Sequence, residues 1–435
     1  MPIDATQIHR TVDWPRRPFR PRPLGAVLAS CVFMPLASGP PAEQPPPAIA
    51  RPASASAVSA EAGTPAFEGY GRAATGGTGG DVYRVTSLDD SGRGTLRDAI
   101  ENRAGPRTVV FDVAGTILLQ GDLVVRRPYL TIDGSTAPPP GITVRQSTLT
   151  DNFIIAGTHD VVVSHLRFRG VWEAGGKHSQ NAATFLVDGD TGPDHVAQRI
   201  VLDHITGRGA VDGGPDLWGE VRDVTVSWCF FFYNWHPTTV SHNPAPFQVR
   251  QRISMHHNVY AKNGERNPQL RADVRGLDYV NNVVYDWGYF GEGSGYGVRI
   301  RSVAGEPTVN ANIVANAFVP TSRRTAWGLV YGVSPGADRD DGGPASPPPQ
   351  GTVLTGTRMG RLWVAGNILP TSNVDRYSTV PEPLAVSPEF QVTTWPASEL
   401  GTRVLPGVGT RYRDEEEQAI LDELAAALER VFSSS

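Results

Sequence analysis

The chain has 435 residues, a formal net charge of -5 at pH 7, 47 glycines and 37 prolines. This length allows one large domain or two ordinary ones, and the glycine and proline content favours short strands and turns over long helices. The negative net charge argues against nucleic acid as a partner, because proteins that bind nucleic acids normally present a basic surface to the phosphates.

The start of the chain has the composition of an export signal followed by a linker. A basic stretch at residues 16–20 precedes a short apolar run at residues 24–36, which predicts an export signal over residues 1–37. Residues 38–65 are rich in proline, alanine and serine and predict a linker, because this composition cannot bury a core. The remainder, residues 66–435, is expected to form one domain.

The chain contains two cysteines, and their positions do not predict a disulfide. Residues 28–31 resemble a bacterial lipoprotein cleavage box, which leaves a lipid anchor at Cys31 open beside ordinary signal cleavage. Cys229 is then expected to be a buried free thiol. No apolar run after the leader approaches the roughly 18 residues that a membrane-spanning helix needs. We expect the mature chain to be secreted, or to be a lipoprotein of the cell surface or periplasm.

Short β-branched strands separated by glycine, asparagine and aspartate turns follow from about residue 67. Strands are predicted at residues 108–113, 129–132, 161–168, 199–204, 223–230, 252–258, 277–284, 309–315 and 361–368. Matching dipeptides recur in six of them: Asp203-His204, Ser227-Trp228, His257-Asn258, Asn281-Asn282, Asn312-Ile313 and Gly366-Asn367. A recurrence of roughly 20 to 30 residues is typical of stacked solenoid coils.

Two architectures can be built from such strands. A β-sandwich predicts alternation of apolar and polar residues together with tight hairpin turns. Residues 161–163 and 230–232 are instead continuously apolar, as in strands that are buried on both faces. The pattern favours a parallel β-helix, in which asparagines at one turn position stack into a hydrogen-bonded ladder.

One loop carries two arginines, Arg266 and Arg271, around Pro268. A proline-stiffened loop can aim two fixed positive charges at an anionic ligand, although two surface arginines in a structural turn give the same pattern. The segment 256–285 resembles the active-site segment of pectate lyases of the pectate lyase/pectin lyase superfamily, which fold as right-handed parallel β-helices. The resemblance covers residues 67–424.

The resemblance also implies how the ends of the β-helix are closed. A glycine-rich loop at residues 67–80, a strand at 82–88 and a short amphipathic helix at 91–100 are implied to cap the N-terminal end. The glycine-rich loop does not predict a nucleotide site, because no Gly-Lys-Ser/Thr follows it. At the other end, residues 414–432 have leucines and alanines at helical spacing after an acidic first turn. They predict a helix packed on the outside of the solenoid.

Calcium ligation is implied for Asp212 and Asp216, which match an Asp-x-x-x-Asp pair of the family. Two carboxylates in a turn of glycine and proline provide the hard oxygen ligands that calcium prefers, and a solvated acidic turn is the structural alternative. Asn181 matches a third ligand position, where the family has an aspartate and this chain has only an uncharged amide. Asp188 is the alternative third ligand, or an ordinary turn residue.

Catalytic roles follow from the same resemblance. Arg266 matches the base that removes a proton in β-elimination, and Arg271 matches the arginine that holds a uronate carboxylate. The family's substrate-binding lysine is absent from residues 233–238, where His236 and Trp235 are the available substitutes for hydrogen bonding and sugar stacking. Packing is the equally open alternative for both.

His256 and His257 invite an interpretation as a metal pair, but adjacent residues of a strand point to opposite faces. We expect a structural role for at least one of them, supporting the arginine loop from beneath.

The expected fold is all-β: a single-stranded right-handed parallel β-helix with an N-terminal cap helix and a C-terminal helix on its outside. The expected activity is Ca²⁺-assisted eliminative cleavage of α-1,4-polygalacturonate, an acidic plant cell-wall polysaccharide, by a monomer. Two alternatives stay open: a calcium-independent pectin lyase acting on methyl-esterified chains, and a non-catalytic polyuronate-binding surface protein. No nucleotide and no membrane span are expected.

Overall fold

In the computed structural model the chain divides into two units, Met1–Glu61 and Ala62–Ser435. The structure describes residues 67–149, 152–172, 183–189, 196–241, 251–271, 274–290, 296–300, 309–321, 327–330, 360–370 and 373–433. The predicted export signal, the linker and Cys31 lie outside the described residues. Among the described helices, none is both long and apolar enough to cross a membrane.

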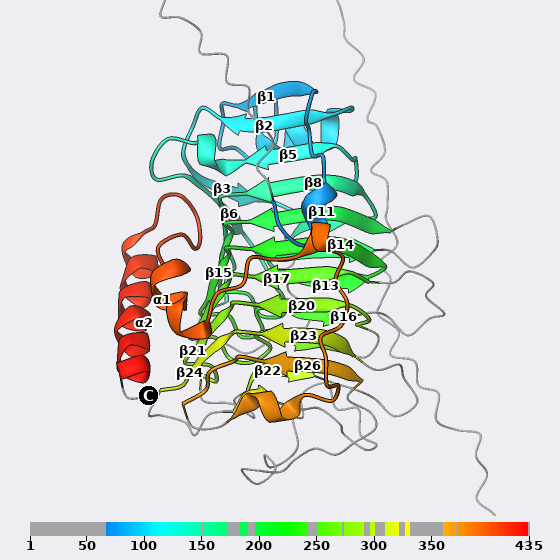
Figure 1. Cartoon of the computed structure of the whole chain (residues 1–435). Helices are drawn as coiled ribbons and strands as arrows, with labels where there is room; N and C mark the ends of the chain where they lie inside the picture. Colours follow the sequence, from blue (N-terminus) through cyan, green and yellow to red (C-terminus); the bar gives the residue numbers. More distant parts are fainter. Residues whose placement is uncertain are drawn as a thin grey trace, which may run out of the picture. The chain divides into compact units, whose positions relative to one another are not determined.

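Three parallel sheets run through the second unit (Figure 1). The first sheet contains, in spatial order, β1 (Asp81–Val85), β2 (Arg107–Phe111), β5 (Leu130–Asp133), β8 (His159–Ser164), β11 (Ala197–Asp203), β14 (Val221–Ser227), β17 (Ile253–His256), β20 (Leu277–Val280), β23 (Asn310–Val314) and β26 (Arg361–Ala365). The second sheet contains β3 (Gly115–Leu119), β6 (Ile142–Gln146), β9 (Leu166–Arg169), β12 (Thr206–Arg208), β15 (Phe230–Phe232), β18 (Val259–Ala261), β21 (Val283–Tyr285) and β24 (Ala317–Val319). The third sheet contains β4 (Leu123–Val125), β7 (Phe153–Ala156), β10 (Phe185–Gly189), β13 (Asp216–Gly219), β16 (Thr239–Ser241), β19 (Gln269–Leu270), β22 (Tyr296–Ile300) and β25 (Trp327–Val330).

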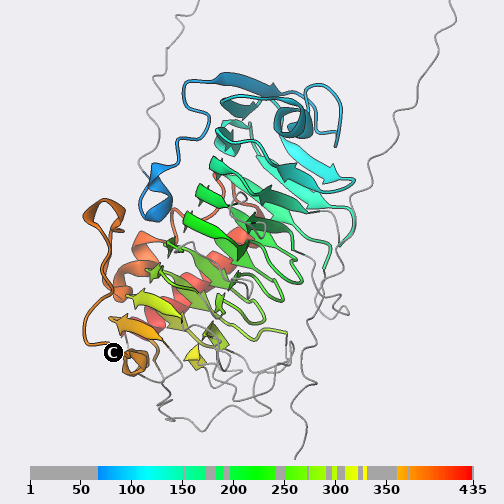
Figure 2. The same ribbon diagram turned by 90° about the vertical axis from the view of Figure 1, so that its right-hand side faces the viewer.

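The chain visits the first, second and third sheets in turn and then returns to the first, one coil further along. Each strand pairs in parallel with the equivalent strand of the neighbouring coil, as β8 does with β11 and β11 with β14. This arrangement is a parallel β-helix, which confirms the expected fold and excludes the sandwich. Figure 2 shows the same stack turned by 90°.

A left-handed backbone residue separates the first sheet from the second in successive coils. His165, His204, Trp228 and His257 have φ angles of 55°, 53°, 54° and 57° at this position. The turn divides the strand predicted at residues 161–168 into β8 and β9, which lie in different sheets. Bulky residues seldom adopt positive φ, so their identity does not signal a turn in the sequence.

An asparagine ladder follows this turn inside the β-helix. The side-chain amide of Asn258 donates to Asn282 at 2.9 Å, that of Asn282 to Asn316 at 3.1 Å, and that of Asn316 to Asn367 at 2.8 Å. The expected ladder is therefore confirmed, and it satisfies polar groups that are inaccessible to water.

The predicted register of the ladder needs two corrections. Asn312 pairs with Asp278 within the first sheet, and the ladder member of that coil is Asn316. His256 pairs with Ser227, so the dipeptide that matches Ser227-Trp228 is His256-His257. When coils differ in length, the spacing between repeats does not show which residues of successive coils stack on one another. An extra residue in a loop shifts the spacing but leaves the apolar pattern of the strands unchanged.

The N-terminal end is closed by a helix shorter than expected. The helical turn η2 (Asp98–Asn102) is a π-helix that follows buried Leu96, and it covers the core where residues 91–100 were predicted to be helical. The buried Arg107 guanidinium donates to the carbonyl oxygens of Ala99, Ile100 and Gly105 at 2.8, 3.1 and 3.0 Å. The bonds to Ala99 and Ile100 satisfy carbonyl groups that a helix end leaves unpaired.

The helix α2 (Glu415–Ser433) packs its apolar side on the outer face of the second sheet, as predicted for residues 414–432. Its first turn is a capping box, in which Asp414 and Glu417 exchange backbone-to-carboxylate hydrogen bonds of 3.1 and 2.8 Å. The Glu417 carboxylate is fully buried and lies 2.8 Å from both Arg167 of β9 and its neighbour Arg169. The remaining short helices are η1 (Tyr70–Ala73), η3 (Gly134–Thr136), η4 (Val374–Tyr377), η5 (Pro388–Phe390), η6 (Ala397–Glu399) and α1 (Leu400–Arg403).

The ladder gives a stability prediction. Asn282→Ala removes a donor to the Met255 carbonyl and an acceptor for Asn258, and both partners stay buried. We expect the free energy of unfolding to fall by about 2–4 kcal/mol, because each unsatisfied buried group costs roughly 1–3 kcal/mol. Chemical denaturation measures the loss. Asn367→Ala, at the half-exposed end of the ladder, is the matched control and should lower the free energy of unfolding by less. An equal decrease in both variants would contradict the account.

Candidate functional site

The loops that lead into three neighbouring strands of the third sheet bring charged side chains together. Leu217, Val240 and Leu270 pair in register on β13, β16 and β19 and face the core. Because side chains alternate along a strand, Asp216 and Thr239 point outward beside them. The preceding loops continue the stacking: the Gly213 amide donates to the His236 carbonyl at 2.9 Å, and the Thr238 amide to the Arg266 carbonyl at 3.2 Å.

Asp212 is the centre of this cluster. Its Oδ1 atom accepts from Arg266 Nη1 at 2.5 Å and lies 3.2 Å from His236 Nδ1. The other ring nitrogen of His236 lies 3.3 Å from Glu265 Oε1. The four side chains are 12–22% exposed, so their charges interact in a medium less polar than water. They form a continuous chain of polar contacts across three coils.

Asp216 lies next to this chain and is almost inaccessible to water. Burial and the nearby Asp212 carboxylate raise the pKa of Asp216 to about 8, while the amide of Thr239, 2.5 Å from Asp216 Oδ1, and the Arg266 charge oppose the shift. Two carboxylates that resist simultaneous ionisation form a place where a cation is favoured. Their oxygens are the donor type that suits Ca²⁺.

Two residues, Asn181 and Asp188, were considered in the sequence as the third ligand. Asn181 lies outside the described residues. Asp188 lies on β10 and pairs with Trp218, whereas the residue that pairs with Asp216 is Leu186. Asp188 is therefore displaced by two residues along β10 from the position opposite Asp216. This displacement argues against Asp188 as a ligand that shares a metal ion with Asp216.

Arg271 directly follows β19, whereas Arg266 precedes it, so the two arginines of the loop lie at opposite ends of this strand. The Arg271 guanidinium lies over the Trp218 ring, 5.7 Å from its centroid. A guanidinium beside an aromatic face can bind a carboxylate while the ring packs on a sugar.

Trp235 belongs to an aromatic cluster at the edge of the site. Its ring centroid lies 6.0 Å from Trp172, 6.1 Å from Phe290 and 5.6 Å from His236. The side chain is half-buried, so it packs on its neighbours and keeps an accessible part. Packing of Trp235 is therefore observed, and its contact with a sugar stays a prediction.

The expected position of His256 and His257 is wrong. Their rings lie beside Glu68 and Trp395 at the end of strand β17 of the first sheet, whereas the arginine loop leads into the third sheet. They also share a hydrogen bond of 2.8 Å instead of pointing to opposite faces. The positive φ of His257 takes this residue out of the strand pleat, and the alternation rule no longer applies.

Sequence reasoning missed Glu265, Thr239 and Trp218. Trp218 follows Asp216 by two residues in a strand, so the period of two placed both on one face and was a usable signal. The position of Thr239 depends on pairing between coils, and that of Glu265 depends on loop conformation. Neither is readable from local spacing.

The amino-acid sequence is similar to those of several known proteins, although no family model matches the chain. A protein of Aspergillus fumigatus named "Probable pectate lyase C" is 32% identical over 276 residues, which cover 62% of this chain and 58% of that relative. "Pectate lyase 4" of Ambrosia artemisiifolia is 29% identical over 252 residues, which cover 54% of this chain and 59% of the relative.

The chain is thus similar in sequence to proteins named pectate lyase. This similarity supports the resemblance to that family. The chain spans 58% and 59% of the length of these two relatives. The crystal structure of jun a 1, the major allergen from cedar pollen, superposes with a TM-score of 0.56 at 18% identity, covering 79% of this chain and 93% of that one. This similarity supports the parallel β-helix.

The raised pKa of Asp216 predicts how stability depends on pH in chelator. A carboxyl group whose pKa is raised on folding contributes stability below its unfolded pKa, near 3.8, and loses it as the pH rises through about 8. At pH 8.5 we expect Asp216→Asn to melt a few degrees higher than the wild type, a difference in stability on the order of 1 kcal/mol or more. At pH 4 we expect the two proteins to melt at nearly the same temperature. Thermal unfolding followed by circular dichroism measures this, and the same difference at both pH values would contradict it.

Proposed function

We propose that the chain is a polysaccharide lyase that cleaves α-1,4-linked polygalacturonate by Ca²⁺-assisted β-elimination and releases 4,5-unsaturated oligogalacturonides. The observation that carries the proposal is the contact of Arg266 with Asp212, next to the buried Asp216. A cation at the two carboxylates and a guanidinium beside them suit an anionic substrate. The names of two relatives, "Probable pectate lyase C" and "Pectate lyase 4", support the same chemistry.

Asp212 and Asp216 are the proposed calcium ligands, with Asn181 as the third. Calcium, when bound, would supply positive charge beside the uronate carboxylate and so make the neighbouring C5 proton more acidic. Two protein carboxylates and one amide leave coordination positions for substrate oxygens, since calcium takes 6–8 oxygen ligands.

Arg266 is the proposed base. It removes the proton from C5, the electron pair forms the C4–C5 double bond, and the C4–O4 bond breaks as the leaving oxygen takes up a proton. An isolated guanidinium keeps its proton at any ordinary pH, and the contact of Arg266 with Asp212 adds an attractive negative charge. If Asp212 also held a cation, the cation would compete for this carboxylate and repel the guanidinium, which would favour the uncharged form that a base requires.

Substrate binding is assigned to Arg271, Trp235 and His236. The guanidinium of Arg271, beside Trp218, suits a uronate carboxylate of a neighbouring sugar. His236 lies between Asp212 and Glu265, which supports an additional role in holding Asp212 in place.

The proposal extends to the organisation of the chain. Residues 1–37 act as an export signal, 38–65 as a linker and 66–435 as the catalytic β-helix. The mature protein is a monomer that is secreted, or is held at the cell surface or in the periplasm by lipid at Cys31.

The role of Arg266 is tested by a conservative substitution. Arg266→Lys keeps the charge but shortens the reach to the substrate, so we expect kcat on polygalacturonate to fall by about 10²–10⁴-fold, the usual contribution of a positioned base. Ultraviolet absorbance of the unsaturated product measures the rate. Arg275→Lys, at an exposed arginine shortly after the same loop, is the matched control and should retain activity. Equal rates for Arg266→Lys and the wild type would refute the assignment.

Removal of the metal tests the cofactor and the alternatives. We expect chelator to abolish the absorbance increase and excess Ca²⁺ to restore it, and Asp212→Asn to need a higher Ca²⁺ concentration. Activity that is unchanged in chelator would instead indicate a calcium-independent pectin lyase. Binding of polygalacturonate without any absorbance increase, with Ca²⁺ present, would indicate a non-catalytic polyuronate-binding protein.

A further inference from the structure

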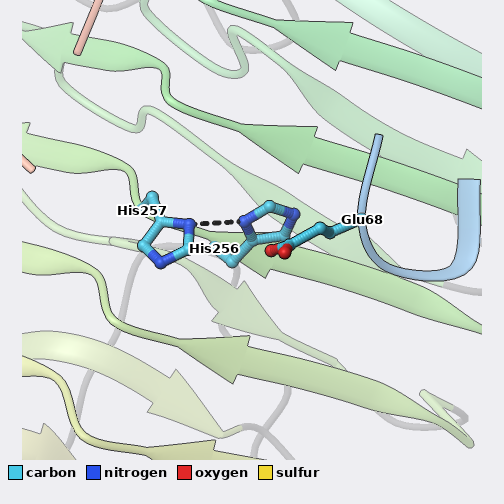
Figure 3. A group of neighbouring side chains, drawn as sticks. All are labelled: Glu68, His256 and His257. Carbon is cyan, nitrogen blue, oxygen red and sulfur yellow. Dashed lines mark hydrogen bonds between the residues drawn. The ribbon is translucent and has the colours of Figure 1, made fainter. Parts of the chain in front are cut away.

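A cluster of metal-binding side chains lies on the first sheet, separate from the candidate site on the third. His256 ends β17 and His257 forms the turn that follows it. Glu68 reaches them from the segment that precedes η1 (Figure 3). Each residue offers one ligand atom, and these atoms all lie within 4.8 Å of one another.

The two imidazole rings are arranged as a pair of ligands would be. Their Nδ1 atoms lie 2.8 Å apart, and the rings are perpendicular. Around a tetrahedral zinc ion, with zinc–nitrogen bonds of about 2.0–2.1 Å, two nitrogen ligands are separated by about 3.3 Å. Separating the Nδ1 atoms by about half an ångström therefore makes room for the ion.

Hydrogen bonding within the protein does not satisfy these rings. His256 and His257 are 2% and 1% exposed, and both Nε2 atoms are buried without a hydrogen-bond partner. If the rings are neutral, one Nδ1 donates to the other, which leaves one Nε2 proton without an acceptor and one Nε2 lone pair without a donor. If both Nδ1 atoms held a metal ion, the proton they share would move to the bare Nε2 of its own ring, and each ring would then be a neutral imidazole protonated at Nε2.

Glu68 is held in place as ligating carboxylates commonly are. The Thr393 amide donates to Glu68 Oε2 at 3.0 Å, and the Thr393 hydroxyl donates to Oε1 at 2.5 Å. Each carboxylate oxygen keeps a further lone pair for a metal ion. Such bonds from the surroundings fix the orientation of a ligand before the metal binds.

We propose that Glu68, His256 and His257 form a zinc site that joins two distant parts of the chain. Two imidazoles and one carboxylate are zinc donors, whereas Ca²⁺ requires more oxygen ligands. The neutral imidazole is the form that binds a metal ion.

The zinc site ties both ends of the domain to the β-helix. Near Glu68, the Tyr70 and Gly71 amides donate to side-chain hydroxyls of the first sheet at 3.0 and 2.9 Å. We call residues 392–395 the C-terminal strap. It contacts Glu68 through Thr393, and the ring of Trp395 lies 4.7 Å from that of His257. Zinc should therefore stabilise the folded chain without taking part in the reaction on the third sheet.

A zinc titration of the full chain tests the inference. After dialysis against chelator, we expect the wild type to take up one Zn²⁺ per chain, to melt several degrees higher with Zn²⁺, and to keep this Zn²⁺ in excess Ca²⁺. Co²⁺ in place of Zn²⁺ should give the visible absorption of a four- or five-coordinate ion. Metal analysis, thermal unfolding and absorbance measure these effects without any use of lyase activity, so the test is independent of the proposed function.

Variants locate the site. Glu68→Gln and His257→Gln should each weaken Zn²⁺ binding by at least tenfold, and Glu68→Gln keeps an oxygen that can accept from Thr393. His204→Gln is the matched control, because His204 occupies the same turn position two coils away, in a neighbouring group with His165 and Asp203. It should bind Zn²⁺ like the wild type. The inference is overturned if the wild type takes up no Zn²⁺ at 100 micromolar (about a hundred times a micromolar Kd), if Glu68→Gln binds normally, or if only His204→Gln loses binding.

Discussion

In-register stacking of parallel coils is the constraint on which the rest of the structure depends. Backbone hydrogen bonds between equivalent strands place residues of the same turn position above one another. Asparagines thereby become a ladder inside the solenoid, and rings at the left-handed turns, such as Trp228 and His257, stack on its outside. The same stacking aligns the loops that precede β13, β16 and β19, so the candidate site is a consequence of register rather than of local sequence.

Within that site, Asp212 connects two functions. One of its oxygens accepts from Arg266 and lies next to His236, while its charge raises the pKa of Asp216. On the proposed function, a cation held by Asp212 would compete with Arg266 for the same carboxylate. Such competition would give a physical route by which metal binding changes the basicity of Arg266, since an arginine without an anionic neighbour loses its proton more easily.

The sequence was sufficient for the fold. Apolar strands, an asparagine ladder and the helix after Asp414 follow from local patterns and are present in the structure, although one asparagine of the predicted ladder, Asn312, lies outside it. The exact ladder partner of Asn282, the cap helix boundary and the location of His256 depended on coil length and positive φ, which residue type does not reveal. The contact of Arg266 with Asp212 joins residues 54 positions apart. Family resemblance supplied both residues, but only stacking explains why they meet.

Calcium affinity of the Arg266→Ala variant tests the central claim most directly. If Asp212 is shared between the arginine and the metal, removal of the guanidinium frees the carboxylate. Calorimetric titration of the purified chain with Ca²⁺, in the absence of substrate, should then give tighter binding than in the wild type, by about tenfold, or roughly 1.4 kcal/mol. Unchanged or weaker binding would show that Arg266 and the cation do not compete for Asp212, which contradicts the account.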